Sequence, residues 1–154
     1  MPTTSPVTSN PALDLFALTY RLASRLSRLF EQSMMGSHGI SLGEWRTMLM
    51  IVLVPDTTAA DVASYFAMDK MAVTRAVQRL TSDGYVTRQR RDNDKRSYSL
   101  RLTARGDELF ARLLPLIETR FMEIVGVLSA EERDGLRAVL LRLFDKVDTL
   151  HTGE

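Results

Sequence analysis

The residues between Thr57 and Thr103 limit the possible folds of this chain more than any other stretch. They open with a short helical pattern, 58–66, and the hydroxyl of Thr57 or Thr58 can accept hydrogen bonds from the free N–H groups of its first turn. Apolar residues recur along it at helical spacing, which predicts an inner stripe of Val62, Ala63 and Phe66. A tight corner at 67–69 then leads into a second helix.

The second helix is predicted over 70–82, with Asp69 as its N-cap and Gly84 suited to a left-handed residue after its end. Its inner side carries small and medium apolar residues: Met68 at the lead-in, then Val73, Ala76, Val77 and Leu80. Its outer side carries Lys70, Met71, Thr74, Arg75 and Gln78. These side chains offer donors, a methyl group and a guanidinium, which are the groups that recognise base edges in the major groove of DNA.

A basic hairpin follows directly. Residues 85–91 and 97–103 are strand-like, and 92–94 have turn chemistry. Tyr98, Leu100 and Leu102 are expected on one side of the second strand. The cations on or near the hairpin tip are Arg88, Arg90, Arg91, Lys95 and Arg96. A sequence pattern of two helices joined at a corner also occurs in many chains without a helix-turn-helix unit. The same pattern followed by an arginine-rich hairpin indicates a DNA-binding unit.

The positive charge of the chain is concentrated in this region. The whole chain has a formal net charge of only +1, yet 70–105 contains ten Lys and Arg residues against three Asp residues. Residues 106–154 contain ten acidic residues against six basic ones. A local excess of cations around one helix and one hairpin predicts a surface for phosphate, although a charge run alone is more often a solvated face.

Four short motifs carry a resemblance to a known family. They are Val73-Thr-Arg-Ala-Val-Gln-Arg-Leu80, Asp83-Gly-Tyr-Val-Thr-Arg88, Asp94-Lys-Arg96 and Leu102-Thr-Ala-Arg-Gly106. From about Leu13 to Leu150 the chain resembles the MarR family of winged helix-turn-helix transcription regulators. The resemblance implies a mainly α fold of the α+β winged-helix type. One departure is Ala67 at the corner, where such units often have glycine, and an alanine with positive φ costs roughly 1 kcal/mol.

The resemblance and the residue chemistry together give a set of DNA-binding candidates. Arg75 is expected to contact a guanine, because its fork matches the two acceptors of that base. The family pattern implies that Arg96 enters the minor groove and that Asp94 holds its guanidinium, although Asp94 can also simply cap the turn. Arg79 is expected to meet phosphate or the hairpin. The full set is Lys70, Met71, Thr74, Arg75, Gln78, Arg79, Arg88, Arg90, Arg91, Asp94, Lys95 and Arg96.

Long amphipathic patterns flank this reader. After a tail at 1–11, helices are expected over about 12–35, with a break at 36–39, and then over about 104–128 and from 130 onward. Residues 12–36 and 104–154 are predicted to form a dimerisation module within a single domain, with 37–103 as the DNA-binding region; an antiparallel bundle inside one monomer is the alternative. The predicted dimer contacts are Leu15, Leu18, Leu22, Leu140, Leu143, Phe144 and Val147.

Several caps and one core stripe are predicted outside the reader. Ser41 with Glu44, and Ser129 with Glu132, form capping boxes, and Thr103 can cap the helix that follows it. The helix after Ser41 is expected to end before Pro55. Its expected inward residues are Leu42, Trp45, Met48, Leu49 and Val52.

A small-molecule effector is a further expectation from the resemblance, because many members repress transcription and leave DNA when a phenolic or carboxylate-bearing molecule binds. The candidate lining is Met35, His38, Trp45, Arg46 and Met48. Arg46 can pair with a carboxylate and Trp45 can stack on a ring. The alternative is that Trp45 and Met48 belong to the core and that His38 is merely exposed.

Other functions have less support in the sequence. No phosphate-binding glycine loop, nucleophile elbow or zinc-protease motif is present, so neither an enzyme nor a cofactor is predicted. A metal-responsive regulator would depend on His38 with Glu31 and Glu44, which offer one imidazole, and no metal site is predicted. A ligand-independent regulator and a protein-interaction module remain open. Without cysteine, signal peptide or membrane span, the chain is expected to be a cytoplasmic protein that binds DNA and a second copy of itself.

Overall fold

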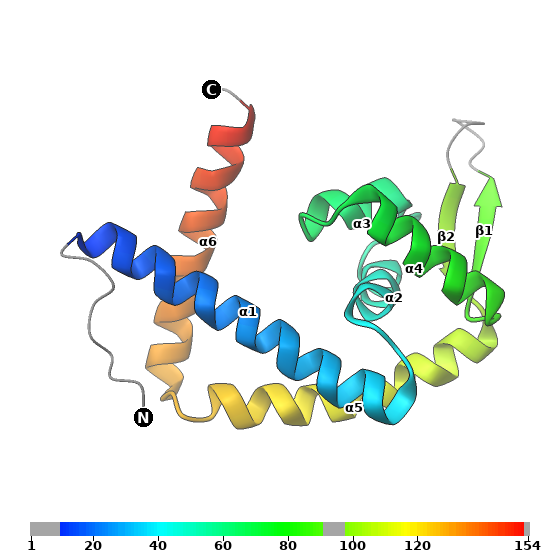
Figure 1. The fold of residues 1–154 in the computed structure, drawn as a ribbon, viewed down its shortest axis with the longest axis horizontal. Helices are drawn as coiled ribbons and strands as arrows, with labels where there is room; N and C mark the ends of the chain where they lie inside the picture. The colour runs from blue at the N-terminus through cyan, green and yellow to red at the C-terminus, as the bar shows by residue number, and fades with distance from the viewer. Residues whose placement is uncertain (1–9, 91–97, 153–154) are drawn as a thin grey trace. The chain divides into compact units, whose positions relative to one another are not determined.

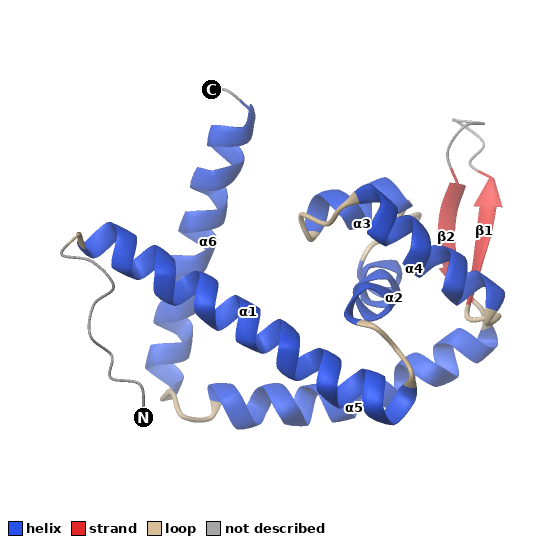
Figure 2. Ribbon diagram, in the orientation of Figure 1, coloured by secondary structure: helices blue, strands red, loops and turns tan. Residues whose placement is uncertain are grey.

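A computed structural model of the chain describes residues 10–90 and 98–152. It confirms the mainly α fold with a two-stranded antiparallel sheet (Figures 1 and 2). The elements in these residues are α1 Pro11–His38, α2 Leu42–Leu53, α3 Ala59–Tyr65, α4 Lys70–Ser82, β1 Val86–Arg90, β2 Tyr98–Leu102, α5 Ala104–Val125 and α6 Ala130–Thr152. They form two compact units, residues 1–108 and 109–154, and α5 begins in the first unit.

The core of the first unit lies between α2, α3, α4 and the hairpin (Figure 1). As predicted, α4 buries Val73, Ala76, Val77 and Leu80, and α3 buries Val62 and Ala63. Trp45 and Met48 of α2 are buried as well, and Phe30 of α1 packs near Trp45 with 6.1 Å between ring centroids. Burial of this apolar side fixes which side of α4 remains in solvent.

Side-chain caps begin the helices of the first unit, and Thr103 caps α5 as predicted, accepting from Gly106 N at 3.1 Å. Ser41 and Glu44 form the predicted capping box of α2, and Asp69 accepts from Ala72 N at 3.0 Å at the start of α4. The alternative between Thr57 and Thr58 is decided: Thr58 caps α3 in a box with Asp61. The buried hydroxyl of Thr57 instead donates to the carbonyl oxygen of Val54, 2.7 Å away, at the end of α2.

The hairpin has the expected direction. Val86 pairs with Leu102, and Arg88 pairs with Leu100. Leu100 is buried, whereas Tyr98, expected on the same side, is 47% exposed. The amide of Leu100 donates to the carbonyl oxygen of Thr57 at 2.7 Å. This hydrogen bond attaches β2 to the start of the helix-turn-helix unit.

The predicted end of the first helix was wrong. The backbone stays helical through Gly36 to His38, and the break comes at Gly39, which has a φ of +68°. A glycine inside a helix costs only about 1 kcal/mol, which a long helix tolerates, whereas the left-handed conformation at its end favours glycine strongly. α5 likewise ends at Val125, three residues before the predicted end and directly before Gly126.

The predicted burial of Val52 was also wrong, since half of its surface is exposed. By helical period Val52 shares the face of Trp45 and Met48, so its exposure comes from its place in the last turn, beyond the side chains that cover this face. Thr47 and Met50 are buried in α2 instead.

The second unit contains the rest of α5 and α6. Its α5 residues Leu109, Phe110, Leu113 and Ile117 are buried. The predicted capping box at the start of α6 is present: Ser129 N donates to Glu132 Oε2 at 2.7 Å, and Glu132 N donates to Ser129 Oγ at 3.2 Å. No helix in the described residues has the length and apolar composition that a membrane span requires.

Candidate nucleic-acid interface

The outer face of α4 presents the side chains that the sequence predicts for reading DNA. Lys70, Met71, Arg75 and Gln78 are exposed, and Thr74 is half-buried. Met71 exposes 60% of its surface, a large fraction for an apolar residue. Since the opposite face of the helix is fixed in the core, these five side chains form one outward surface, called here the reading face.

Thr74 contributes to the reading face in a particular way. Its hydroxyl donates to the carbonyl oxygen of Lys70, 2.8 Å away and one turn earlier in the same helix. The proton is therefore used inside α4, and the oxygen retains only its acceptor capacity. Thr74 can thus offer an acceptor and a methyl group to a partner, rather than the donor expected of a free hydroxyl.

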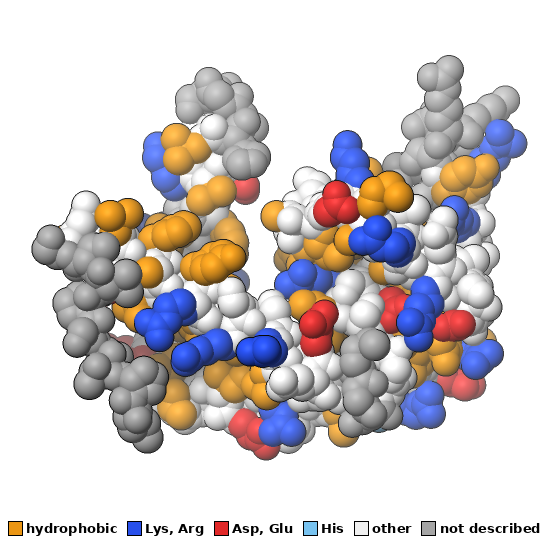
Figure 3. All heavy atoms as spheres, viewed as in Figure 1, with side chains coloured by type: hydrophobic (Ala, Val, Ile, Leu, Met, Phe, Trp, Pro, Cys, Tyr) orange, Lys and Arg blue, Asp and Glu red, His pale blue; other side chains and the backbone are white. Residues whose placement is uncertain are grey.

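Three cations near this surface have no carboxylate partner in the described part of the chain. Among residues 10–90 and 98–152, no carboxylate forms an ion pair with Lys70, Arg75 or Arg88. Arg101, by contrast, pairs with Asp56 at 2.8 Å. Figure 3 shows Lys and Arg side chains over α4 and the hairpin. Unpaired cations on an exposed face attract phosphate without first breaking an ion pair.

Arg79 differs from these cations. Its Nε lies 3.2 Å from Oε1 of the buried Glu44 and 3.8 Å from Oδ2 of Asp83. The phosphate contact predicted for Arg79 would therefore compete with two carboxylates.

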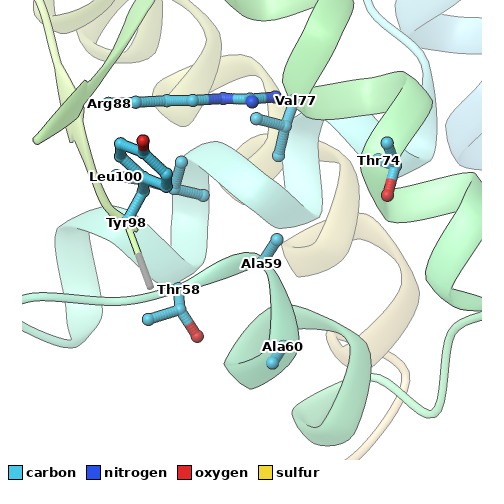
Figure 4. Close-up of a pocket in the computed structure, with 8 residues that line it drawn as sticks. All are labelled: Thr58, Ala59, Ala60, Thr74, Val77, Arg88, Tyr98 and Leu100. Carbon is cyan, nitrogen blue, oxygen red and sulfur yellow. The ribbon is translucent and has the colours of Figure 1, made fainter. Parts of the chain in front are cut away.

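A pocket of about 290 Å³ joins the reading helix to the hairpin (Figure 4). Arg88 extends from β1 across it toward Val77, with Tyr98 and Leu100 beside it. The start of α3 closes another side with Thr58, Ala59 and Ala60, and Thr74 of α4 completes the lining.

The sequence identified Arg88 and Thr74 as site residues but missed Tyr98 and the α3 residues as lining. The alternation of side chains between the two faces of β2 is the sequence signal that could have indicated Tyr98 as a lining residue.

Four predicted wing residues, Arg91, Asp94, Lys95 and Arg96, lie outside the described residues, as does the side chain of Met35. Arg90 lies in β1 and is exposed. Of the predicted hairpin cations in the described residues, Arg88 lies beside Thr74 and Val77 of α4.

The remaining effector candidates have different surroundings. Trp45 and Met48 are buried in the core, and His38 is exposed. The guanidinium of Arg46 lies 5.4 Å from the ring centroid of Phe66. Burial lowers the pKa of Arg46, and the nearby carboxylate of Glu31 partly offsets this. In this conformation Met48 offers no surface to a ligand.

The seven predicted dimer contacts are all exposed. Leu15, Leu18 and Leu22 of α1 and the four residues of α6 each expose between 38% and 62% of their surface in the single chain. Exposed apolar rows of this kind are typical of surfaces that a partner covers. No group of three His, Cys, Asp or Glu side chains able to hold a metal ion occurs in the described part of the chain.

Comparisons with known proteins agree with this geometry. The MarR family profile matches residues 38–97. An HTH-type transcriptional regulator, BilQ of Clostridium symbiosum, is 30% identical over 115 residues, covering 75% of this chain and 80% of the relative. The HTH-type transcriptional repressor YetL of Bacillus subtilis is 24% identical over 138 residues, 88% of this chain and 82% of its own.

A solved structure matches the fold over most of its length. The crystal structure of a MarR/EmrR family transcriptional regulator from Acinetobacter sp. ADP1 superposes with a TM-score of 0.82 and 26% sequence identity. The match covers 91% of this chain and 99% of that one.

Proposed function

The chain belongs to the MarR family of transcriptional regulators, and on this premise we propose that it is a dimeric repressor that binds a pseudo-palindromic operator in double-stranded DNA. Members of the family bind DNA as dimers and are not enzymes. The relative YetL is a transcriptional repressor by name, which supports repression over activation.

One observation carries the proposal: the reading face of α4 is exposed and holds uncompensated cations, while its opposite face is fixed in the core. In the proposed complex α4 lies in the major groove. Arg75 contacts a guanine, Gln78 is suited to an adenine, and Met71 is suited to the methyl group of a thymine. Two protomers related by a twofold axis would read half-sites about 34–36 Å apart.

The hairpin contributes phosphate contacts in this proposal. Arg88 and Arg90 of β1 and Lys70 of α4 neutralise backbone charges, as do Arg91 and Lys95. Arg96 enters a narrow minor groove, whose negative potential attracts a guanidinium, and Asp94 orients it. The last two roles rest on the resemblance of Asp94-Lys-Arg96 to the family pattern.

The proposal includes release from DNA by a small aromatic or carboxylate molecule. Arg46 is a half-buried cation next to an aromatic ring, which suits a carboxylate ligand. Trp45 and Met48 would have to move before they could contact it, because both are buried. A ligand-independent regulator is therefore retained as the alternative.

The test is binding to the DNA upstream of the chain's own coding sequence. The wild type should shift this fragment in a gel, and Arg75→Ala should weaken binding by about 1–3 kcal/mol. Arg112→Ala, which removes an exposed arginine of α5, is the control and should bind like the wild type. Equal affinity of Arg75→Ala for this fragment and for unrelated DNA of the same length would support the assignment, whereas wild-type affinity would refute it.

A further inference from the structure

The core of the first unit contains a buried carboxylate, that of Glu44, which has no part in the proposed function. Glu44 is only 2% exposed. Its Oε2 accepts a hydrogen bond from Ser41 N at 2.7 Å, and its Oε1 lies 3.2 Å from Arg79 Nε. One side chain therefore begins α2 and also holds a residue in the last turn of α4.

The backbones of α2 and α4 come close beside this pair. A Cβ added at Gly43 would lie 3.4 Å from Met68 Cε and 3.7 Å from the Cβ of Ala76. Apolar contacts of this kind hold the two helices together but specify their rotation weakly, because small side chains allow neighbouring arrangements. The ion pair of Arg79 with Glu44, a buried carboxylate that is itself held by the hydrogen bond from Ser41 N, favours one of these arrangements.

The rotation of α4 matters because Arg75 precedes Arg79 by four residues. Side chains four apart in a helix project from the same face, one turn above the other. A rotation of α4 that moves Arg79 away from Glu44 therefore turns Arg75 away from its direction in this structure. By holding Arg79, Glu44 sets the direction of the reading face.

The charges around Arg79 argue against a direct phosphate contact. Its guanidinium lies between the carboxylates of Glu44 and Asp83. It also sits in the last turn of α4, where the helix dipole favours a positive charge. Moving Arg79 to a DNA phosphate would leave Glu44 buried without its cation, which is costly.

We propose that Glu44 and Arg79 form a positioning pair that aims the reading face, and that Arg79 does not contact DNA. This inference rests on the proposed function. It differs from the phosphate contact that the sequence predicts for Arg79, and the two roles give different results in one experiment.

The experiment is a double-mutant cycle with Glu44→Gln, Arg79→Gln and the double variant. Glutamine retains the capping box at the start of α2, so folding is expected and is checked by circular dichroism. The probe is a duplex enriched by the wild type from a random-sequence pool, with a scrambled duplex of equal length. Affinities are measured by fluorescence anisotropy over a range of salt concentrations.

A positioning pair gives three results together. Each single variant loses about tenfold in affinity for the enriched duplex, and the double variant loses no more, because both changes break one interaction. Affinity for the scrambled duplex stays within about twofold of the wild type. The slope of log affinity against log salt stays unchanged in all three variants, since no phosphate contact is lost.

Two matched variants calibrate the experiment. Arg88→Gln removes an uncompensated arginine and should reduce the slope by about 0.9 per protomer. Arg120→Gln removes an arginine whose partner, Glu123 at 2.7 Å, is exposed, and it should bind like the wild type. If Arg79→Gln does not fold, Arg79→Met, which removes the charge and keeps an unbranched side chain, replaces it in the cycle.

A reduced slope in Arg79→Gln, independent of Glu44, would show a phosphate contact and overturn the inference. Wild-type binding by both single variants would also overturn it. If the wild type enriches no sequence from the pool, the proposed function itself fails, which is a separate outcome.

Discussion

At the scale of single residues, two backbone segments of the first unit pack tightly where the hairpin leads into α5. The carbonyl oxygen of Tyr85 accepts from Thr103 N at 3.0 Å, and Gly106 packs directly against the same carbonyl group. A Cβ at Gly106 would overlap this oxygen. The glycine of the Leu102-Thr-Ala-Arg-Gly106 motif is therefore required by space rather than by backbone flexibility.

Gly106→Ala should lower the free energy of unfolding by roughly 1–3 kcal/mol, because the backbone must shift to admit the methyl group. Urea denaturation followed by circular dichroism measures it. Gly135→Ala is the matched control: a Cβ at Gly135 in α6 meets nothing, so this change should leave the stability equal or raise it by up to about 1 kcal/mol. Equal stability of both variants would contradict the packing argument.

The corner between α3 and α4 gives a second test at this scale. Ala67 has a φ of 49°, as the sequence suggested for this position. Ala67→Gly should therefore be neutral or raise the free energy of unfolding by up to about 1 kcal/mol. The same substitution at the exposed Ala60 of α3 should lower it by about that amount. Thermal unfolding of the two variants measures both changes in stability. Equal losses of stability in Ala67→Gly and Ala60→Gly would mean that the backbone at the corner is unstrained.

At the scale of elements, α3 depends on its cap. A helix of seven residues is not stable alone. Its first turn is held by the box of Thr58 and Asp61, in which Thr58 N and Thr58 Oγ1 donate to Asp61 Oδ2 and Asp61 N donates to Thr58 Oγ1. The main-chain bond from Val62 N to Thr58 O continues the helix. The cap also lies beside β2, through the bridge between Thr58 and Ser99.

Thr58→Ala should lower the free energy of unfolding by about 1 kcal/mol and speed amide hydrogen exchange in α3 more than in α4. Thr58→Ser retains the hydroxyl and should restore most of the loss. If Thr58→Ser and Thr58→Ala are equally unstable, the methyl group of Thr58, and not the cap, stabilises α3.

The elements were largely predictable from the sequence because their signals are local. Caps such as Asp69 and the inner stripe of α4 depend on neighbours within a few residues. The predictions were wrong where the burial of a residue depends on distant contacts, or where two local signals for a helix end compete. Val52 has the right period for burial but no cover, and Gly36 resembles a helix break until the stronger signal of Gly39 is compared with it.

The site was predictable to a smaller degree. The outward side of α4 follows from helical period, so the exposure of Lys70, Met71, Arg75 and Gln78 was predictable from spacing alone, whereas their contact with DNA stays a prediction. The pairing of Arg79 with Glu44 joins residues 35 positions apart, and no local pattern in one sequence indicates it. The cation–π contact of Arg105 with Tyr85, at 4.8 Å, was missed for the same reason.

At the scale of the whole molecule, apolar rows on α1 and α6 remain exposed in the single chain. Each such side chain would gain about 25 cal/mol for every Å² removed from water, which favours association of two copies. None of the seven predicted contacts lies on α4 or the hairpin. In the proposed complex, pairing and reading would therefore use separate surfaces.

Phe144→Asp should convert a dimer into monomers, because a carboxylate would be desolvated in an apolar interface. Sedimentation velocity over a range of concentrations measures the change. Val52→Glu, an equally polar change at an exposed residue of α2 outside the predicted contacts, should leave the dimer intact. Sedimentation of the wild type as a monomer at concentrations where it binds its operator would contradict the proposed assembly.

The separation of the two surfaces has a consequence for cells that carry two versions of the gene. In the proposed dimer, a chain with Arg75→Ala would keep the apolar rows of α1 and α6 and should still associate with intact copies. Mixed pairs then hold one competent and one defective reader, and they lose the half-site that the defective copy should fill. We expect such an allele to interfere dominantly, and the same allele carrying Phe144→Asp as well to be recessive.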